Sequence, residues 1–169
     1  PVTIQGRGVP IKVLPRPVIL VHGWNSSADT WSAYPGFLRS IHPDWRGYAV
    51  GDGQAPGTMD TGSFGSFGKR ILENADILGT YIDGVRQQTN AWHVDIVAHS
   101  KGGLISRQYI HGLMAQEPDG RPAVIHLIML GTPNAGSSCA DVGAVYSAGF
   151  YELMRLFVGL FSRVVYLTN

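Results

Sequence analysis

One stretch of the sequence combines a serine with the local pattern that makes a serine reactive. Residues 95–99, Asp-Ile-Val-Ala-His, are typical of the end of a buried strand, and Ser100 follows them directly. Gly102 and Gly103 come next, and the apolar residues beyond them recur at helical spacing. A serine at a sharp strand-to-helix turn stands clear of the sheet, where its hydroxyl can attack a carbonyl carbon. The pattern therefore predicts a nucleophile at Ser100, although a serine before a helix also commonly serves as its N-cap.

A serine nucleophile needs a base to take its proton and amide donors to stabilise the oxyanion that forms. One candidate donor is the amide of Lys101, directly after the serine, and another is that of Trp24, which follows His22 and Gly23 after an earlier apolar run. A third apolar run ends shortly before Thr132. Because sites in open parallel sheets lie at the carboxyl ends of strands, we expect these three loops to meet at one place.

The elements that would position these loops follow from the alternation of apolar runs and helical spacing. Strands are expected at residues 18–21, 47–50, 93–98 and 124–130, and helices at 30–41, 67–89 and 101–116. This order predicts an α/β fold, a three-layer α/β/α sandwich with a mostly parallel sheet and right-handed crossovers. Residues 1–17 carry short β-prone pieces broken by glycines and prolines, and we expect an edge strand or an extended arm there.

The composition and charge of the chain exclude several kinds of partner and cofactor. The 169 residues carry a net charge of +1 without basic runs, so nothing favours nucleic acid as a partner. The single cysteine, Cys139, stands alone and no histidines are paired at metal-ligand spacing, so we expect neither a metal nor a cofactor. The chain opens with Pro1 and has no cleavable apolar segment, which we interpret as a mature or excised N-terminus. A secreted or periplasmic location is slightly favoured.

We expect one domain, with a core over residues 1–141 and an apolar helical segment over 142–169. Glu152, Arg155 and Arg163 lie within that segment and argue against a membrane span. Two interpretations remain for it. It is either an ordinary core helix or a lid over an apolar pocket, hinged at its glycines, that makes transient contact with a lipid interface.

The three motifs together resemble the α/β-hydrolase superfamily, and within it the pattern is similar to bacterial lipases and carboxylesterases. The motifs are Val-His-Gly-Trp at 21–24, Ala-His-Ser-Lys-Gly-Gly at 98–103 and Leu-Gly-Thr-Pro-Asn-Ala-Gly-Ser at 130–137. They occur in the order found in that superfamily, and the resemblance extends from about residue 18 to residue 137. The first glycine of the serine motif is Ala98 here, which is still small enough for the tight turn.

The resemblance implies Ser100 as the nucleophile and the amides of Trp24 and Lys101 as the oxyanion hole. It also implies a structural role for His99, a wall of the substrate pocket from residues 131–138, and an ester or lipid substrate. The apolar end of the chain favours apolar acyl esters. The Lys101 side chain is expected to be a solvated surface group. A thioesterase, deacylase or acyltransferase would use the same machinery.

The acid and base of a catalytic triad are not found in this sequence. In the superfamily both follow the serine in chain order, but His111 falls on a predicted helix and His126 within a predicted strand. Asp95 also lies within a strand and is expected to be a structural hydrogen-bonding group. We therefore expect the acid and histidine beyond Asn169, on the remainder of a longer hydrolase. The alternative is a hydrolase-like binding module that has lost its base.

Overall fold

The computed structural model describes residues 2–4, 7–9, 13–51, 58–63 and 66–137. The chain divides into two compact units, residues 1–132 and 133–169, and only residues 133–137 of the second are described. The apolar segment predicted at 142–169 lies outside the described residues.

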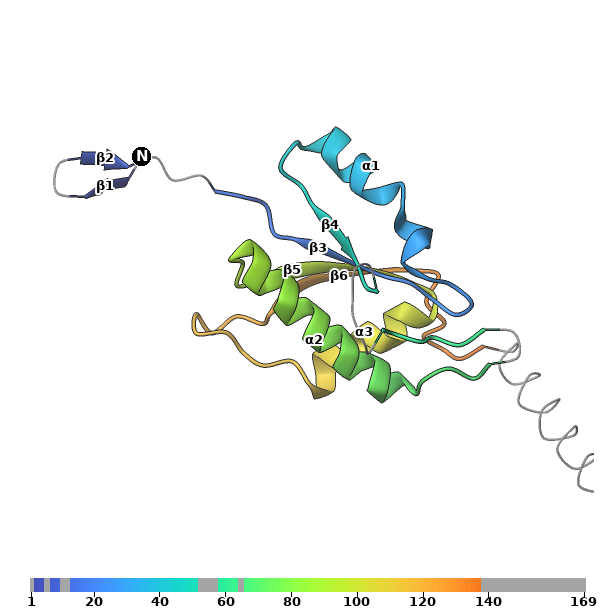
Figure 1. Ribbon diagram of the computed structural model, residues 1–169. Helices are drawn as coiled ribbons and strands as arrows, with labels where there is room; N and C mark the ends of the chain where they lie inside the picture. The colour runs from blue at the N-terminus through green and yellow to red at the C-terminus, as the bar shows by residue number, and fades with distance from the viewer. Residues whose placement is uncertain (1, 5–6, 10–12, 52–57, 64–65, 138–169) are drawn as a thin grey trace, which may run out of the picture. The chain divides into compact units, whose positions relative to one another are not determined.

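The first unit is built on a four-stranded parallel sheet (Figure 1). Its strands are β3 (Val18–Val21), β4 (Gly47–Ala49), β5 (Val94–His99) and β6 (Val124–Leu130), in the order β4-β3-β5-β6. All three neighbouring pairs are parallel. The chain steps outward from β3 to β4 and then crosses back to the other side of β3. The loops after β3 and β5 therefore leave two neighbouring strands at a topological switch point, where open α/β sheets place their sites.

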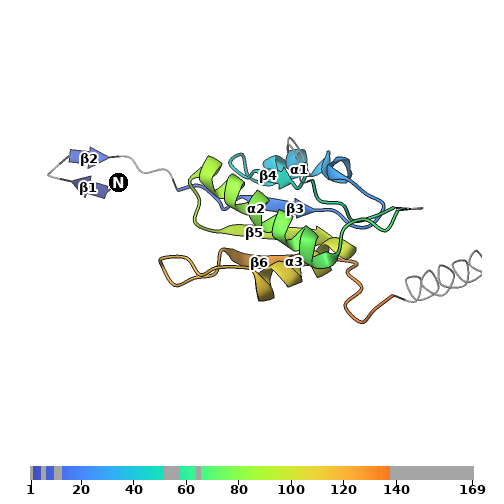
Figure 2. The same ribbon diagram turned by 60° about the horizontal axis from the view of Figure 1, so that its bottom comes forward.

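Helices cover both faces of this sheet. A short 3₁₀ helix, η1 (Ala28–Trp31), and α1 (Tyr34–Ile41) follow β3, whereas α2 (Ile71–Thr89) and α3 (Lys101–Gly112) flank β5 in the chain. Figure 1 shows α1 on one side of the sheet and α2 and α3 on the other, and Figure 2 shows α2 and α3 lying across the strands. The predicted α/β sandwich with a parallel sheet is confirmed.

The alternation of side chains along β3 explains why this strand is apolar throughout. Successive residues of a strand point to opposite faces. Ile19 and Val21 pack in the larger core with α2 and α3, whereas Leu20 packs with Trp31 and Val97 on the opposite face. Because both faces are covered, each of these β3 side chains is buried, and the run has no polar position.

The predicted helices differ from the observed ones at their ends. The segment expected as one helix over 30–41 forms η1 and α1, and Pro35 occupies the first turn of α1, where it removes no hydrogen bond. α2 begins at Ile71, not at 67, because Glu73 accepts a hydrogen bond from the Arg70 amide at 2.7 Å and stabilises a helix start there.

Two further predictions need correction. α3 ends at Gly112, four residues before the expected end at 116, because Gln116 pairs with Pro122 across the following turn. At the N-terminus, β1 (Val2–Ile4) and β2 (Arg7–Val9) pair with each other as an antiparallel hairpin. Among the described residues this hairpin is a separate sheet, not an edge strand of the main one.

Candidate active site

Ser100 lies between the last residue of β5 and the first residue of α3, in a backbone conformation that is rare for a residue with a side chain. Its φ is +53° and its ψ is −127°. A non-glycine residue held there costs on the order of 1–3 kcal/mol. Hydrogen bonds hold it in place, because the Ser100 amide donates to Leu130 O at 2.8 Å and the Gly103 amide donates to Ser100 O at 3.0 Å. The Ser100 hydroxyl does not cap α3.

The loop after β3 lies directly against this serine. A Cβ atom placed on Gly23 would lie 2.7 Å from Ser100 Cβ and 3.0 Å from His99 O. Carbon atoms do not approach so closely without displacement, so a side chain at position 23 would push the loop away from Ser100. The glycine therefore brings the peptide between Gly23 and Trp24 next to the serine.

The two glycines after the serine allow equally close packing on the other side. A Cβ atom on Gly102 would lie 2.5 Å from His22 O and 2.7 Å from Val21 O, which places the first turn of α3 against the end of β3. A Cβ atom on Gly103 would overlap the side chain of Thr132, whose buried Oγ1 has no hydrogen-bond partner within the described part of the chain. The three loops that contain His22, Ser100 and Thr132 thus lie together at the carboxyl end of the sheet.

His22 is buried beneath this edge, with its Nδ1 atom 3.2 Å from Gly23 O. Burial lowers the pKa of the His22 imidazole, because the charged ring would lose its hydration. The ring is therefore neutral at pH 7. Its position under the loop after β3 makes it part of the support for that loop.

Because of His22, we expect the free energy of unfolding to decrease as the pH falls below about 6.5. The unfolded chain takes up a proton near this ordinary pKa, whereas the folded chain does so only at a lower pH, so protons favour the unfolded state in between. Urea unfolding at pH 7.5 and at lower pH measures the loss, and His22→Gln should reduce it. His111→Gln, at an exposed position on α3, is the matched control and should leave the loss unchanged.

Lys101 departs from its expected surface role. Its side chain is half-buried, and its Nζ atom donates a hydrogen bond to Thr61 O at 2.9 Å. Burial lowers the pKa of the Lys101 ammonium. The lysine thus connects the first turn of α3 with a segment 40 residues earlier in the chain. The spacing of residues along the sequence could not have predicted this contact.

That earlier segment, residues 58–63, contributes a residue that sequence reasoning missed. Thr61 is only 2% exposed, and its Oγ1 donates to Gly23 O at 2.6 Å. Next to it, Gly62 O accepts a hydrogen bond from the Asn25 amide at 2.7 Å. Residues 51–66 are rich in glycine, serine and threonine, but no motif singles out a side chain among them. The structure shows that Thr61 and Gly62 of this segment are hydrogen-bonded to the loop after β3.

Asn74 fixes the same segment from α2. Its Oδ1 accepts from the Asp60 amide at 2.8 Å, and its Nδ2 donates to Asp60 O at 2.8 Å and to Lys69 O at 3.0 Å. The side chain is fully buried. An amide among apolar residues on the inner face of a predicted helix is a signal that could have pointed to this role.

Replacing Asn74 with alanine is expected to lower the free energy of unfolding by about 2 kcal/mol, because the part-buried backbone groups of residues 60 and 69 lose the partners that this buried side chain provides. Urea denaturation measures this. Gln88→Ala removes an exposed amide from the same helix and should cost a few tenths of a kcal/mol at most. Equal losses in the two variants would contradict the role assigned to Asn74.

An aspartate–histidine pair exists, but at the wrong end of the sheet. His126 Nδ1 lies 2.8 Å from Asp95 Oδ1, and Arg16 Nε donates to Asp95 Oδ2 at 3.0 Å. These residues pair in register four positions before His99 and Leu130, which is about 13 Å along a strand. Asp95 thus has the structural role expected of it, and His126 is too far from Ser100 to take its proton.

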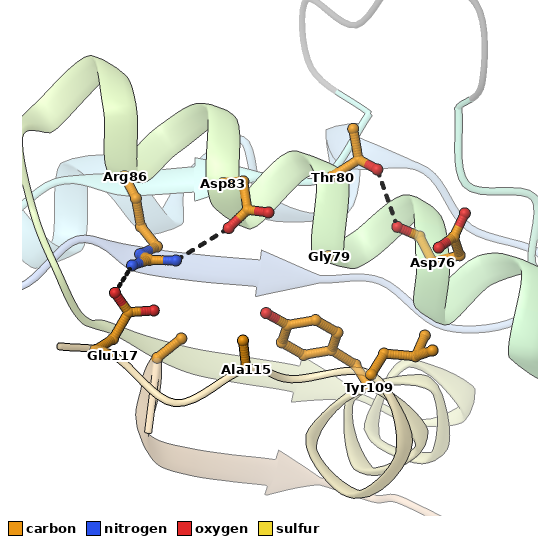
Figure 3. A pocket seen from close by; sticks show the side chains of 10 residues that line it. Asp76, Gly79, Thr80, Asp83, Arg86, Tyr109, Ala115 and Glu117 are labelled. Carbon is orange, nitrogen blue, oxygen red and sulfur yellow. Dashed lines mark hydrogen bonds and ion pairs between the residues drawn. The ribbon is translucent and has the colours of Figure 1, made fainter. Parts of the chain in front are cut away.

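A cavity of about 190 Å³ opens between α2 and α3 (Figure 3), at a distance from the serine turn. Arg86 crosses it, with ion pairs to Asp83 and Glu117, and Tyr109 closes one side. Burial raises the pKa of Tyr109 to about 12. The residues that line the cavity belong to the helices and to the turn before β6, so it is separate from the carboxyl edge of the sheet.

Among the described residues, no group of three or more histidine, cysteine, aspartate or glutamate side chains is arranged to hold a metal ion. None of the helices described is both long enough and apolar enough to cross a bilayer.

Solved structures of similar fold include two bacterial enzymes. The mature form of lipase BlEst2 from Bacillus licheniformis is 24% identical with a TM-score of 0.55, over 81% of this chain and 50% of that one. The propeptide form of the same lipase is 24% identical with a TM-score of 0.54, over 80% of this chain and 27% of that one. Phospholipase PlaB from Legionella pneumophila is 21% identical with a TM-score of 0.53, over 76% of this chain and 27% of that one. The present chain thus spans half or less of the length of these proteins.

The likeness to these structures, together with the parallel sheet and its strand order, identifies the fold as that of the α/β-hydrolases. A match to the family DUF7379, described as a domain of unknown function, covers residues 66–154. The chain belongs to this family. The matched region includes α2, β5, Ser100, α3 and β6.

Proposed function

We propose that the protein is a serine ester hydrolase that forms an acyl-enzyme on Ser100. The observation that carries this proposal is the backbone of Ser100, a non-glycine residue at a φ of +53° whose hydroxyl does not cap the helix that follows. Strained conformations persist where surrounding structure enforces them, and they concentrate at active sites. The Ser100 side chain neither caps the helix nor suits this strained backbone conformation. A reactive hydroxyl at the turn explains why a serine is found there.

In the proposed reaction, the Ser100 Oγ attacks the ester carbonyl carbon and its proton passes to a general base. The carbonyl oxygen becomes an oxyanion, and the amides of Lys101 and Trp24 stabilise it. The alcohol leaves with a proton from the base, and water then hydrolyses the acyl-serine. The end of α3 that begins at Lys101 adds partial positive charge from its free amides. Gly23 lets the loop that carries Trp24 approach the serine, and Gly102 lets the turn that carries Lys101 pack against the end of β3.

We place the base and its acid outside the described residues, beyond Asn169. Ser100 Oγ has no hydrogen bond to a histidine within the described ranges, and the Asp95–His126 pair is at the opposite end of its strands. The chain spans half or less of the solved lipase structures that it resembles. The proposal therefore applies to the full natural polypeptide.

Apolar acyl esters are the proposed substrates. The apolar side chain of Trp24, in the loop that lies against Ser100, is 43% exposed. Exposed apolar groups beside a reactive serine favour contact with an acyl chain, because burying them against it gains about 25 cal/mol per Å². Two proteins of similar fold are a lipase and a phospholipase, which favours the same class of substrate.

A fluorophosphonate probe tests the proposal on the full natural polypeptide. We expect one phosphonate on Ser100, located by peptide mass spectrometry, together with hydrolysis of p-nitrophenyl esters of several chain lengths. A folded protein that takes no label would be a binding module. Labelling together with faster turnover of thioesters than of matched oxygen esters would indicate a thioesterase.

A further inference from the structure

We infer that Thr61 is a positioning residue that holds both amide donors of the proposed oxyanion hole, an inference that rests on the proposed function. Its hydroxyl bonds the residue before one donor, and its carbonyl bonds the side chain of the other. No other residue between β4 and α2 makes both contacts among the described ranges.

The peptide between Gly23 and Trp24 carries the first of the two donors. This peptide is trans, so its carbonyl and its amide N–H point in opposite directions. Thr61 Oγ1 donates to Gly23 O at 2.6 Å. A bond that fixes the direction of the carbonyl also fixes the direction of the Trp24 N–H. The Thr61 hydroxyl thereby sets the orientation of the donor proposed for the oxyanion.

Lys101 carries the second donor amide. The Lys101 Nζ atom donates a hydrogen bond to Thr61 O at 2.9 Å. The backbone carbonyl of the same threonine therefore binds the side chain of the residue that carries the second donor amide. The contact joins the first turn of α3 to the segment beside β3. One residue thus links the two loops whose amides must converge on a single oxygen atom.

Thr61 can act as a rigid support because it is buried and its neighbours are held by hydrogen bonds. It is 2% exposed, and its neighbours on both sides are bonded in turn. Asp60 is held on its amide and carbonyl by Asn74, and Gly62 O accepts from the Asn25 amide. Asn25 directly follows Trp24, so the loop is anchored before and after the donor amide.

The expected consequence is specific to the transition state. Oxyanion donors act at 2.7–3.1 Å from the developing charge, and a displacement of about 1 Å costs about 100-fold in rate. Thr61→Val keeps the shape of the side chain and removes the hydroxyl. We expect a loss of about 10- to 100-fold in kcat and in the rate of phosphonylation of Ser100, with KM changed less than about threefold.

The test uses matched variants of the full natural polypeptide. Thr61→Ser retains the hydroxyl and should recover kcat to within about threefold of the wild type. Thr89→Val removes a hydroxyl bond of the same length, 2.6 Å to Val85 O, at the far end of α2, and should leave kcat unchanged. Lys101→Met keeps the donor amide but frees Thr61 O, and should lower kcat by about threefold to tenfold.

Distinct outcomes separate this inference from the proposed function. If hydrolysis depends on Ser100 but Thr61→Val behaves like Thr89→Val, Thr61 has no positioning role and the proposed function stands. Hydrolysis that survives Ser100→Ala removes the proposed function, and the inference with it. If Thr61→Val does not fold, Lys101→Met decides, and an unchanged kcat in that variant overturns the inference.

Discussion

Replacing Ser100 with alanine is expected to lower kcat for ester hydrolysis by about four orders of magnitude or more. The variant lacks the atom that forms the acyl-enzyme, while the donors and the substrate contacts remain. Residual hydrolysis would then come from water attacking an ester polarised by the oxyanion donors. Because Ser100 is half-buried and makes no capping bond, its hydroxyl contributes little to the fold. The activity should fall without a matching loss of stability.

Ser100→Gly serves as the second variant of this pair. It should lose activity like the alanine variant, but it should be more stable than the alanine variant by about 1 kcal/mol, because glycine adopts a φ of +53° without steric cost. Steady-state hydrolysis and urea denaturation of both variants measure the two effects. Activity retained by either one would exclude an acyl-enzyme on Ser100. Equal stability of the two would show that the turn carries no strain.

The sheet was predictable because its strands carry their signal locally. Residues 18–21 and 94–98 are short apolar runs that end at turn-forming sequences, and parallel strands covered on both faces require such runs. Met129 and Leu130 look like core residues in the sequence, yet they are exposed in the described chain, since β6 is the edge of the described sheet. The pattern identifies the strand but not which strand lies beside it.

The candidate site was predictable only in part. Residues close together in the sequence could be predicted, whereas contacts between residues far apart in the sequence could not. Ser100 and Gly102 belong to one local turn, whose requirement for small residues is visible in the sequence. Thr61 meets Gly23 across 38 residues and Lys101 across 40. No propensity or periodicity encodes those contacts, because they depend on how β3, β5 and the segment before α2 come together in space.

The N-terminal hairpin illustrates a different limit. The prolines and glycines of residues 1–17 indicate that this part of the chain is no central strand, and that conclusion agrees with the separate sheet of β1 and β2. They do not indicate a partner. An edge strand, an arm and a hairpin all satisfy the same local preferences, and the pairing of Val2 with Val9 is what distinguishes them.

Replacing Gly102 with alanine is expected to damage both fold and activity. The new Cβ atom would lie 2.5 Å from His22 O and 2.7 Å from Val21 O. Both are backbone atoms at the end of β3, so relief requires α3 to tilt or β3 to shift. Such overpacking costs about 3 kcal/mol, whereas the better helix propensity of alanine returns about 1 kcal/mol at most. We expect a net loss of about 2 kcal/mol in the free energy of unfolding.

The same shift should lower kcat by about 100-fold, because α3 begins with the donor amide of Lys101 and a displacement near 1 Å is enough for such a loss. Urea denaturation and steady-state kinetics measure the two effects. Gly84→Ala is the matched control. Gly84 is an exposed residue within α2 whose Cβ would meet nothing within 4 Å, so that alanine should stabilise the protein by about 0.5–1 kcal/mol and leave kcat unchanged. Opposite signs for the two substitutions would show that close packing, and not helix propensity, requires glycine after the serine. A stabilising effect of Gly102→Ala would contradict the contact between α3 and the end of β3.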